Sequence, residues 1–234
     1  MVEDYATLLE TYRKMFGMVD AFHFNSQNTA EVYSQYIDIP AASKVIPITH
    51  SGIKDRRKAR CYDERLLRLG FIGSEAPYKG LPFLKNVIDQ LNKEGYTDKI
   101  TLYVYGGRTG YDENLSNVVY KGRYTSTMME HVFDDMDLLI VPSIWYETFS
   151  LVTLEALSFG IPVLVSNNVG AKDIVEKYNS EFVFRDKNNL YELIKTLVKN
   201  RKLLVNYNKA IINNEWNYSL KKHADQITKE LYKR

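Results

Sequence analysis

Residues 138 to 165 read LLIVPSIWYETFSLVTLEALSFGIPVLV, and the order of apolar and polar residues in this stretch decides the fold. Residues 138–141 are a short apolar run closed by a proline, which predicts a buried strand of a parallel sheet. After a polar break, leucines recur at helical spacing until Gly160 and Pro162 end the predicted helix. Residues 161–165 begin a second buried strand. The stretch therefore predicts a βαβ unit.

The polar break in this unit has features of an anion site. Thr148 or Ser150 can cap the helix, whose free N–H groups and partial positive charge attract an anion. In an open parallel sheet, ligands bind at the carboxyl ends of the strands. Glu147 precedes the helix, and Glu155 lies about 7–8 Å of helical rise beyond Ser150. The two carboxylates can thus bracket a diphosphate, and a nucleoside diphosphate sugar has this layout.

Composition argues against several classes of protein. The 234 residues contain 31 basic and 29 acidic side chains, and a net charge of +2 argues against nucleic acid as the main partner. The single Cys61 excludes an internal disulfide framework and favours a reducing cytoplasm. Neither a transmembrane run nor a signal peptide is apparent. We expect a cytoplasmic protein and leave open peripheral contact with the inner face of a membrane.

Four regions are predicted along the chain. Residues 1–50 contain two helices and two short strands, and the apolar stripe of the first helix favours a docking face over a membrane anchor. Residues 51–67 are rich in lysine and arginine and indicate a crossing segment between domains. Its charge fits either a solvated connector or contact with an anionic surface. Residues 68–213 form the main domain, and residues 214–234 are a polar terminal helix.

The main domain alternates strands with helices, which predicts βαβ units and right-handed crossovers. The expected strands are residues 69–73, 100–105, 118–120, 138–141 and 161–165. The expected helices between and after them are residues 81–91, 127–133, 151–158, 172–178 and 190–198. The predicted fold class is α/β, a Rossmann-like parallel sheet with helices on both faces.

Two further turns add to the site. Gly73 permits close approach of a ligand to the backbone, and Lys79 at the mouth of a helix can set a point charge against phosphate oxygens. After the strand that ends near residue 120, a glycine and Tyr124 could receive a flat base. By itself, each turn is a weak signal that is more typical of a solvated surface loop. Only their combination with Glu147 and Glu155 indicates a nucleotide.

A resemblance to a known family rests on four segments, which are GFIGSEAPYKG (70–80), YGG (105–107), VVYKGRY (118–124) and the opening stretch. In this order they resemble the donor-binding half of retaining GT-B glycosyltransferases, the glycosyl transferases of group 1, family 4. The Glu-x7-Glu pair of Glu147 and Glu155 is the hallmark of that family. Residues 21–53 resemble the last elements of its acceptor-side domain, so a short remnant of an N-terminal domain is expected.

The resemblance implies a role for each site residue. Glu147 contacts the donor sugar and faces its reacting carbon, Glu155 holds the ribose hydroxyls, and Lys79 binds the diphosphate. Glu147 and Lys79 are the catalytic candidates, and catalysis by fixed charges requires no metal and no cofactor. The substrate-binding candidates are Gly73, Ser74, Lys79, Tyr124, Glu147, Thr148, Phe149, Ser150, Leu151 and Glu155.

The implied reaction moves a sugar from a nucleotide donor, UDP-sugar favoured over GDP-sugar, to a glycan or lipid-linked acceptor in polysaccharide biosynthesis. Relatives often carry arginine at the position of Ser74 and glycines at those of Thr148 and Ser150. Because the acceptor-side domain is largely absent, we expect no activity without that domain, supplied in cis or in trans. The histidines, at positions 23, 50, 131 and 223, have no spacing typical of a metal site or a base.

Two alternative functions are compatible with a Rossmann-like fold. A nucleotide-sugar-binding or interaction module without turnover has the same fold, because sites rather than folds confer function. A dinucleotide dehydrogenase is disfavoured, since no G-x-G-x-x-G opens a helix.

Overall fold

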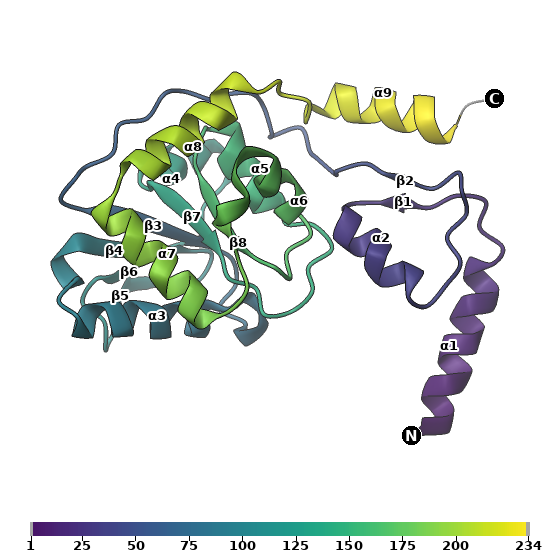
Figure 1. Ribbon diagram of the computed structural model, residues 1–234, viewed down its shortest axis with the longest axis horizontal. Coiled ribbons are helices and arrows are strands. Elements are labelled where there is room, and N and C mark those ends of the chain that lie inside the picture. Colours follow the sequence, from purple (N-terminus) through teal and green to yellow (C-terminus); the bar gives the residue numbers. More distant parts are fainter. Residues whose placement is uncertain (1, 233–234) are drawn as a thin grey trace.

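The computed structural model describes residues 2–232. In this part of the chain, a large α/β body lies beside a smaller N-terminal unit, and coil segments connect the two (Figure 1). The body is built on a seven-stranded sheet in the order β5-β6-β4-β3-β7-β8-β9, in which β5 alone runs antiparallel. The strands are β3 (Leu67–Ile72), β4 (Ile100–Tyr105), β5 (Thr109–Tyr111), β6 (Val118–Gly122), β7 (Leu138–Val141), β8 (Val163–Ser166) and β9 (Val183–Phe184).

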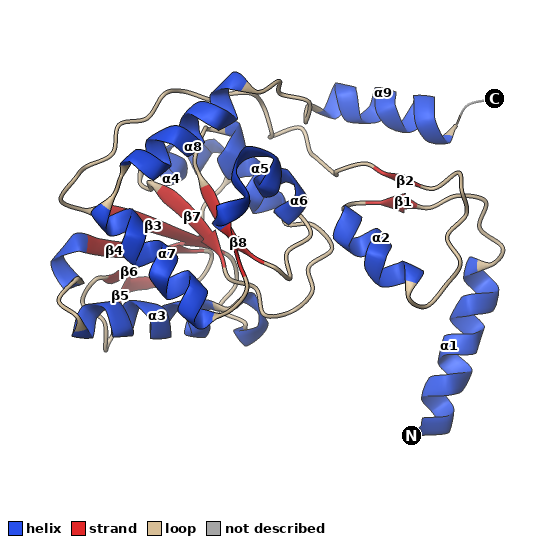
Figure 2. Cartoon of the chain, viewed as in Figure 1, coloured by secondary structure: helices blue, strands red, loops and turns tan. Residues whose placement is uncertain are grey.

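Helices cover both faces of this sheet. They are α3 (Leu81–Lys93), α4 (Met129–Asp134), α5 (Leu151–Ser158), α6 (Lys172–Asn179), α7 (Lys187–Lys199) and α8 (Lys202–Asn213). Helices α3 and α7 contact each other on one face, while α6 and α8 contact each other on the other. Figure 2 shows the red strands between these two layers of blue helices. The predicted fold class, a Rossmann-like parallel sheet with helices on both faces, is confirmed.

Burial of the central strands explains why apolar and polar residues do not alternate in the strands of residues 138–165. Every residue of β7 and β8 is buried, because each strand has a neighbour on both sides and helices on both faces. The predicted strands at residues 100–105 and 138–141 match β4 and β7 in full. Strand β8 begins at Val163, two residues later than predicted, after the proline. Strands β5 and β9 and helix α8 were not predicted.

The N-terminal unit consists of α1 (Val2–Phe16), β1 (His23–Phe24), α2 (Gln27–Ser34) and β2 (Lys44–Val45), with β1 and β2 paired in parallel. Large apolar side chains of α1, such as Tyr5 and Tyr12, are exposed in the described part of the chain, so the docking face stays a prediction. The unit touches the body through α2, where the N–H group of Gln27 donates to Oδ2 of Asp173 at 2.7 Å.

Two arginines of the crossing segment have neither of the roles predicted for its charge, a solvated connector or contact with an anionic surface. Residues 53–66 form neither helix nor strand, as predicted for a connector. The side chains of Arg57 and Arg60, however, are only 9% and 8% exposed. Arg57 donates to the carbonyl of Asn214 at 2.7 Å, and Arg60 binds Asp134 at 3.2 Å. These cations therefore fasten the segment to its own body, and the prediction of a solvated or partner-binding stretch was wrong for them.

The last helix of the described residues is α9 (Leu220–Leu231), which leaves the body and runs above the N-terminal unit in the view of Figure 1. Positions 1, 233 and 234, included in the predicted terminal regions, lie outside the described residues. Within residues 2–232, the helices are too short or too polar to cross a membrane. The four domain boundaries stay predictions.

Candidate functional site

The turn after β3 and the loop after β7 meet at the carboxyl edge of the sheet and enclose a cavity of about 170 Å³. Its lining includes Gly73, Lys79, Ser143, Glu147 and Ser150. Four of these five residues, all except Ser143, are predicted site residues, and they come together where parallel sheets bind ligands.

Lys79 and Glu147 form the polar centre of this cavity. Lys79 ends a short 3-10 turn, and its Nζ lies 2.7 Å from Oε1 of Glu147. The hydroxyl of Ser143 donates to the same oxygen. Because the lysine and glutamate side chains are 34% and 15% exposed, the pair is shielded on most sides while open to a ligand. Ser143 was missed by sequence reasoning, since a serine after a strand carries no distinguishing signal.

The backbone of Glu147 is fixed by the loop that follows β8. Its N–H group donates to the carbonyl of Asn168 at 2.9 Å, and its carbonyl accepts from the N–H group of Gly170 at 2.9 Å. A side chain at Gly170 would collide with the carbonyl of Thr148, so these two loops pack backbone against backbone. The Glu147 carboxylate is therefore held by a rigid scaffold.

Ser150 occupies the N-cap position of α5, but it does not cap the helix as predicted. Its φ of 109° makes it the only residue other than glycine with positive φ in the described chain. Its Oγ accepts a hydrogen bond from the hydroxyl of Thr153 at 3.1 Å and none from a backbone N–H group. The first N–H groups of α5 thus lack a side-chain cap and remain available to an anion.

Glu155, in the second turn of α5, has two different carboxylate oxygens. Oε1 lies 2.9 Å from Nε2 of His50. Oε2 is buried and has no hydrogen-bond partner in residues 2–232. Burial and the nearby charge of Glu155 raise the pKa of the Tyr124 hydroxyl above its ordinary value, so these two predicted residues lie near each other. The ring of Tyr124 packs edge-on against Tyr105 at 6.1 Å.

The other candidates divide into two groups. Leu151 lines the cavity beside Gly73, as predicted. Ser74 is exposed outside the lining, and the Phe149 side chain is 3% exposed in the core, so only its backbone could serve a ligand. Thr148 lies outside the lining as well, and its carbonyl accepts hydrogen bonds from two hydroxyls of the N-terminal unit. Ser74 and Thr148 are therefore not placed in the cavity.

Sequence comparison shows the family. Residues 67–200, more than half of the chain, match the family described as glycosyl transferases group 1. This chain belongs to that family. The match includes every predicted site residue, but it leaves out the N-terminal unit and most of the crossing segment.

Relatives of this group 1 family member agree with the fold. Protein CapJ of Staphylococcus aureus is 28% identical over 179 residues, which are 62% of this chain and 46% of CapJ. The structure of HepE from Anabaena in complex with UDP aligns with a TM-score of 0.75 and 18% identity, over 97% of this chain and 67% of HepE. WaaG, a glycosyltransferase involved in lipopolysaccharide biosynthesis, aligns with a TM-score of 0.67 and 18% identity, over 88% of this chain and 61% of WaaG. The chain spans about half the length of the first curated relatives it matches.

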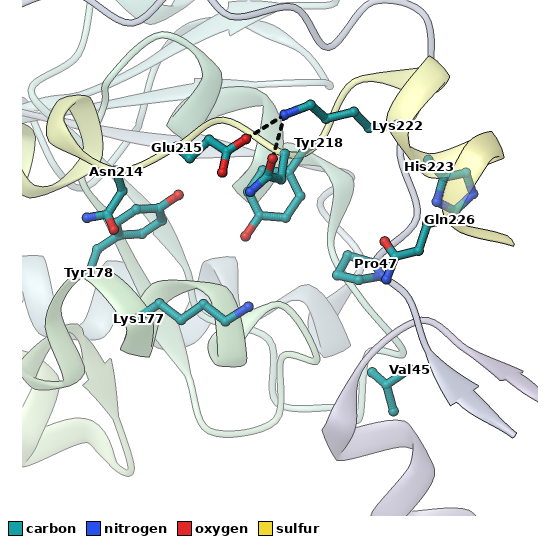
Figure 3. Close-up of a pocket in the computed structure, with 11 residues that line it drawn as sticks. Val45, Pro47, Lys177, Tyr178, Asn214, Glu215, Tyr218, Lys222, His223 and Gln226 are labelled. Atoms are coloured by element: carbon teal, nitrogen blue, oxygen red, sulfur yellow. Dashed lines mark hydrogen bonds and ion pairs between the residues drawn. The ribbon is translucent and has the colours of Figure 1, made fainter. Parts of the chain in front are cut away.

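A second, larger cavity of this family member lies between α9, α6 and the segment after β2 (Figure 3). It has a volume of about 540 Å³, but no predicted site residue lines it. Its Lys222 donates to Glu215 at 2.8 Å, a contact marked by a dashed line in Figure 3, and to Asn217 at 2.6 Å. This cavity is the crevice where the terminal helix leaves the body, and the cavity at the sheet edge remains the candidate site.

No cluster of three or more histidine, cysteine, aspartate or glutamate side chains placed to hold a metal ion occurs within residues 2–232. Metal independence of the chemistry stays a prediction.

Proposed function

We propose that this chain is the donor-binding part of a retaining glycosyltransferase of the Glu-x7-Glu type, which transfers a sugar from a nucleoside diphosphate sugar to a glycan or lipid-linked acceptor. The observation that carries the proposal is the cavity at the carboxyl edge of the sheet, where Lys79 and Glu147 lie against the uncapped start of α5, the helix that also carries Glu155. A cation and free N–H groups at such an edge are the features that bind the phosphates of a nucleotide.

These groups suggest a donor that binds along the carboxyl edge of the sheet. Its diphosphate would bind between Lys79 and the uncapped start of α5, where a cation and free N–H groups converge. The ribose would then reach the carboxylate of Glu155, and the base would lie by Tyr124. The sugar would extend in the other direction, toward Glu147.

In the proposed reaction, the bond between the anomeric carbon and the diphosphate oxygen breaks, and the electron pair leaves with the diphosphate. Lys79 and the N–H groups of α5 stabilise that charge without reorganising, which is the main contribution expected of a preorganised site. Glu147 stabilises the positive charge that develops on the sugar. The acceptor oxygen then forms its bond to the anomeric carbon and its proton passes to the departed diphosphate, with retention of the anomeric configuration and without a metal or cofactor.

The acceptor is expected on the side of Glu147. Three large side chains of the loop before it, Ile144, Trp145 and Tyr146, are 55%, 69% and 64% exposed. We expect this apolar rim to face the acceptor and the acceptor-side domain, so that the chain is inactive without that domain. The likeness to WaaG supports a glycan or lipid-linked acceptor, and HepE, whose structure contains UDP, supports a UDP-sugar over a GDP-sugar.

Calorimetry with UDP and GDP tests the proposal. The wild-type chain is expected to bind UDP more tightly than GDP, while Lys79→Ala and Glu155→Ala each lose about tenfold or more in affinity, since each removes a hydrogen bond involving a charged group. Lys177→Ala is the matched control, because Lys177 is an exposed lysine that lines the cavity in Figure 3 and not the candidate site. Absence of binding by the wild type, or unchanged affinity in both site variants, would overturn the proposal.

A further inference from the structure

His50 connects the crossing segment to the candidate site. Its Nε2 lies 2.9 Å from Oε1 of Glu155, across 105 positions of sequence. The match to glycosyl transferases group 1 begins at residue 67, so it includes the glutamate and leaves out the histidine. Sequence reasoning gave His50 no role, and no local pattern could have paired it with Glu155.

The hydrogen bonds of the His50 ring indicate which of its two nitrogens carries the proton. The N–H group of Gly52 donates to Nδ1 of His50 at 3.1 Å, so Nδ1 is an acceptor and carries no proton. The proton of the neutral imidazole therefore lies on Nε2 and is donated to Oε1 of Glu155. A side chain at Gly52 would come within 2.8 Å of the His50 ring, so the glycine permits this close turn.

The chain around His50 sets the position of the ring without help from a ligand. The hydroxyl of Thr49 donates to the carbonyl of Tyr218 at 2.7 Å, and Ile53 is 2% exposed in the core. The N–H group of Ile53 in turn donates to the carbonyl of His50 at 3.0 Å. The imidazole is thus fixed from both sides before any nucleotide arrives.

We infer that His50 is a positioning residue for the nucleotide: by donating to Oε1 of Glu155 it fixes the rotamer of the carboxylate that accepts from the ribose hydroxyls of a nucleoside diphosphate. This inference rests on the proposed function. Without the imidazole, Glu155 has no partner in the described chain for either oxygen, and the carboxylate can turn away toward water. The residue that directly precedes the crossing segment thereby becomes part of the donor site.

The test compares UDP with 2′,3′-dideoxy-UDP, which lacks the ribose hydroxyls, on the full chain by calorimetry. Wild type is expected to prefer UDP by about tenfold or more, as for hydrogen bonds to a charged group. His50→Asn, whose amide is too short to reach Glu155, is expected to lose most of this preference through weaker UDP binding, with the affinity for the dideoxy ligand unchanged. His50→Gln, whose amide nitrogen can replace Nε2, is expected to retain most of it.

The outcomes separate the inference from the function it rests on. If His50→Asn keeps the wild-type preference, or loses affinity equally for both ligands, the histidine does not act on the ribose and the inference is overturned. Lys79→Ala is the control, because it should weaken both ligands equally. A wild-type chain that binds neither ligand overturns the proposed function itself, whereas tight binding without preference removes only the ribose role of Glu155 and with it that of His50.

Discussion

The ammonium group of Lys79 lies 2.7 Å from Oε1 of Glu147, although one residue follows β3 and the other follows β7. Before any donor binds, the cation proposed for the diphosphate is therefore neutralised by the carboxylate proposed for the sugar. An incoming diphosphate must share Lys79 with Glu147 and approach that negative charge. Lys79 therefore favours binding of the diphosphate, whereas Glu147 disfavours it.

This competition predicts that Glu147→Gln binds UDP more tightly than wild type. Removing one negative charge from a partly exposed pair contributes about 1 kcal/mol, or about fivefold in Kd, and the gain should shrink as salt screens the charges. Calorimetry at low and high ionic strength measures it. Glu176→Gln, the same change at an exposed site on α6, should leave the affinity unaltered. Weaker or equal binding by Glu147→Gln at low salt would contradict the competition.

The sequence was sufficient to predict the strands and the glutamates at the carboxyl edge of the sheet, because buried strands appear in it as short runs of apolar residues. The apolar runs of β7 and β8 and the Glu-x7-Glu spacing all lie within 28 consecutive positions, 138 to 165. Strand β5 was missed because its three residues are exposed and carry no apolar pattern. Helix α8 was missed although Leu204, Tyr207 and Ile211 recur at helical spacing, so its signal was present and not used.

The partners of the site residues could not be predicted from local patterns. Arg57 and Arg60 looked like solvent charges in the sequence, but their guanidinium groups bind carbonyls and carboxylates of distant segments. His50 and Glu155 likewise meet only after the crossing segment is packed. Composition reports how many charges a segment carries, whereas their pairing depends on long-range packing.

Ser150 provides a test of backbone strain. A side chain at φ 109° costs about 1–2 kcal/mol, because Cβ crowds the neighbouring carbonyl, while glycine adopts such values freely. After allowance for the greater freedom of glycine in the unfolded chain, Ser150→Gly should raise the free energy of unfolding by about 1 kcal/mol. That corresponds to a rise of about 2–4 °C in Tm, measurable by calorimetry.

Ser219→Gly is the matched control for this prediction. Ser219 also occupies an N-cap position, but its φ is −72° and its hydroxyl accepts from the N–H group of Lys222. Glycine there removes a cap and relieves no strain, so stability should fall by a few tenths of a kcal/mol. If Ser150→Gly were also destabilising, the left-handed backbone of Ser150 would not be a source of strain.

We expect protonation of Asp112 to cause part of the loss in the free energy of unfolding at low pH. Its side chain is 1% exposed and lies 2.5 Å from Nζ of Lys85, and it also accepts from the hydroxyl of Tyr120. Burial alone would raise the pKa of this carboxyl, but the Lys85 contact and a backbone N–H bond outweigh burial, so its pKa lies below the ordinary value. The stabilisation is therefore complete above the unfolded value of about 3.9 and is lost as pH falls through the folded pKa.

We expect wild type to lose stability below about pH 4, and Asp112→Asn to lose less over the same interval because it has no carboxylate to protonate. At pH 7 the variant should be less stable by about 2 kcal/mol, since Lys85 loses its charged partner. Urea unfolding at pH 7, 5 and 3 measures both effects. Asp89→Asn, which breaks a surface pair with Lys93 on α3, should keep the wild-type acid slope. An acid slope of Asp112→Asn equal to that of wild type would mean that Asp112 does not titrate in the unfolding transition, and the low pKa would be wrong.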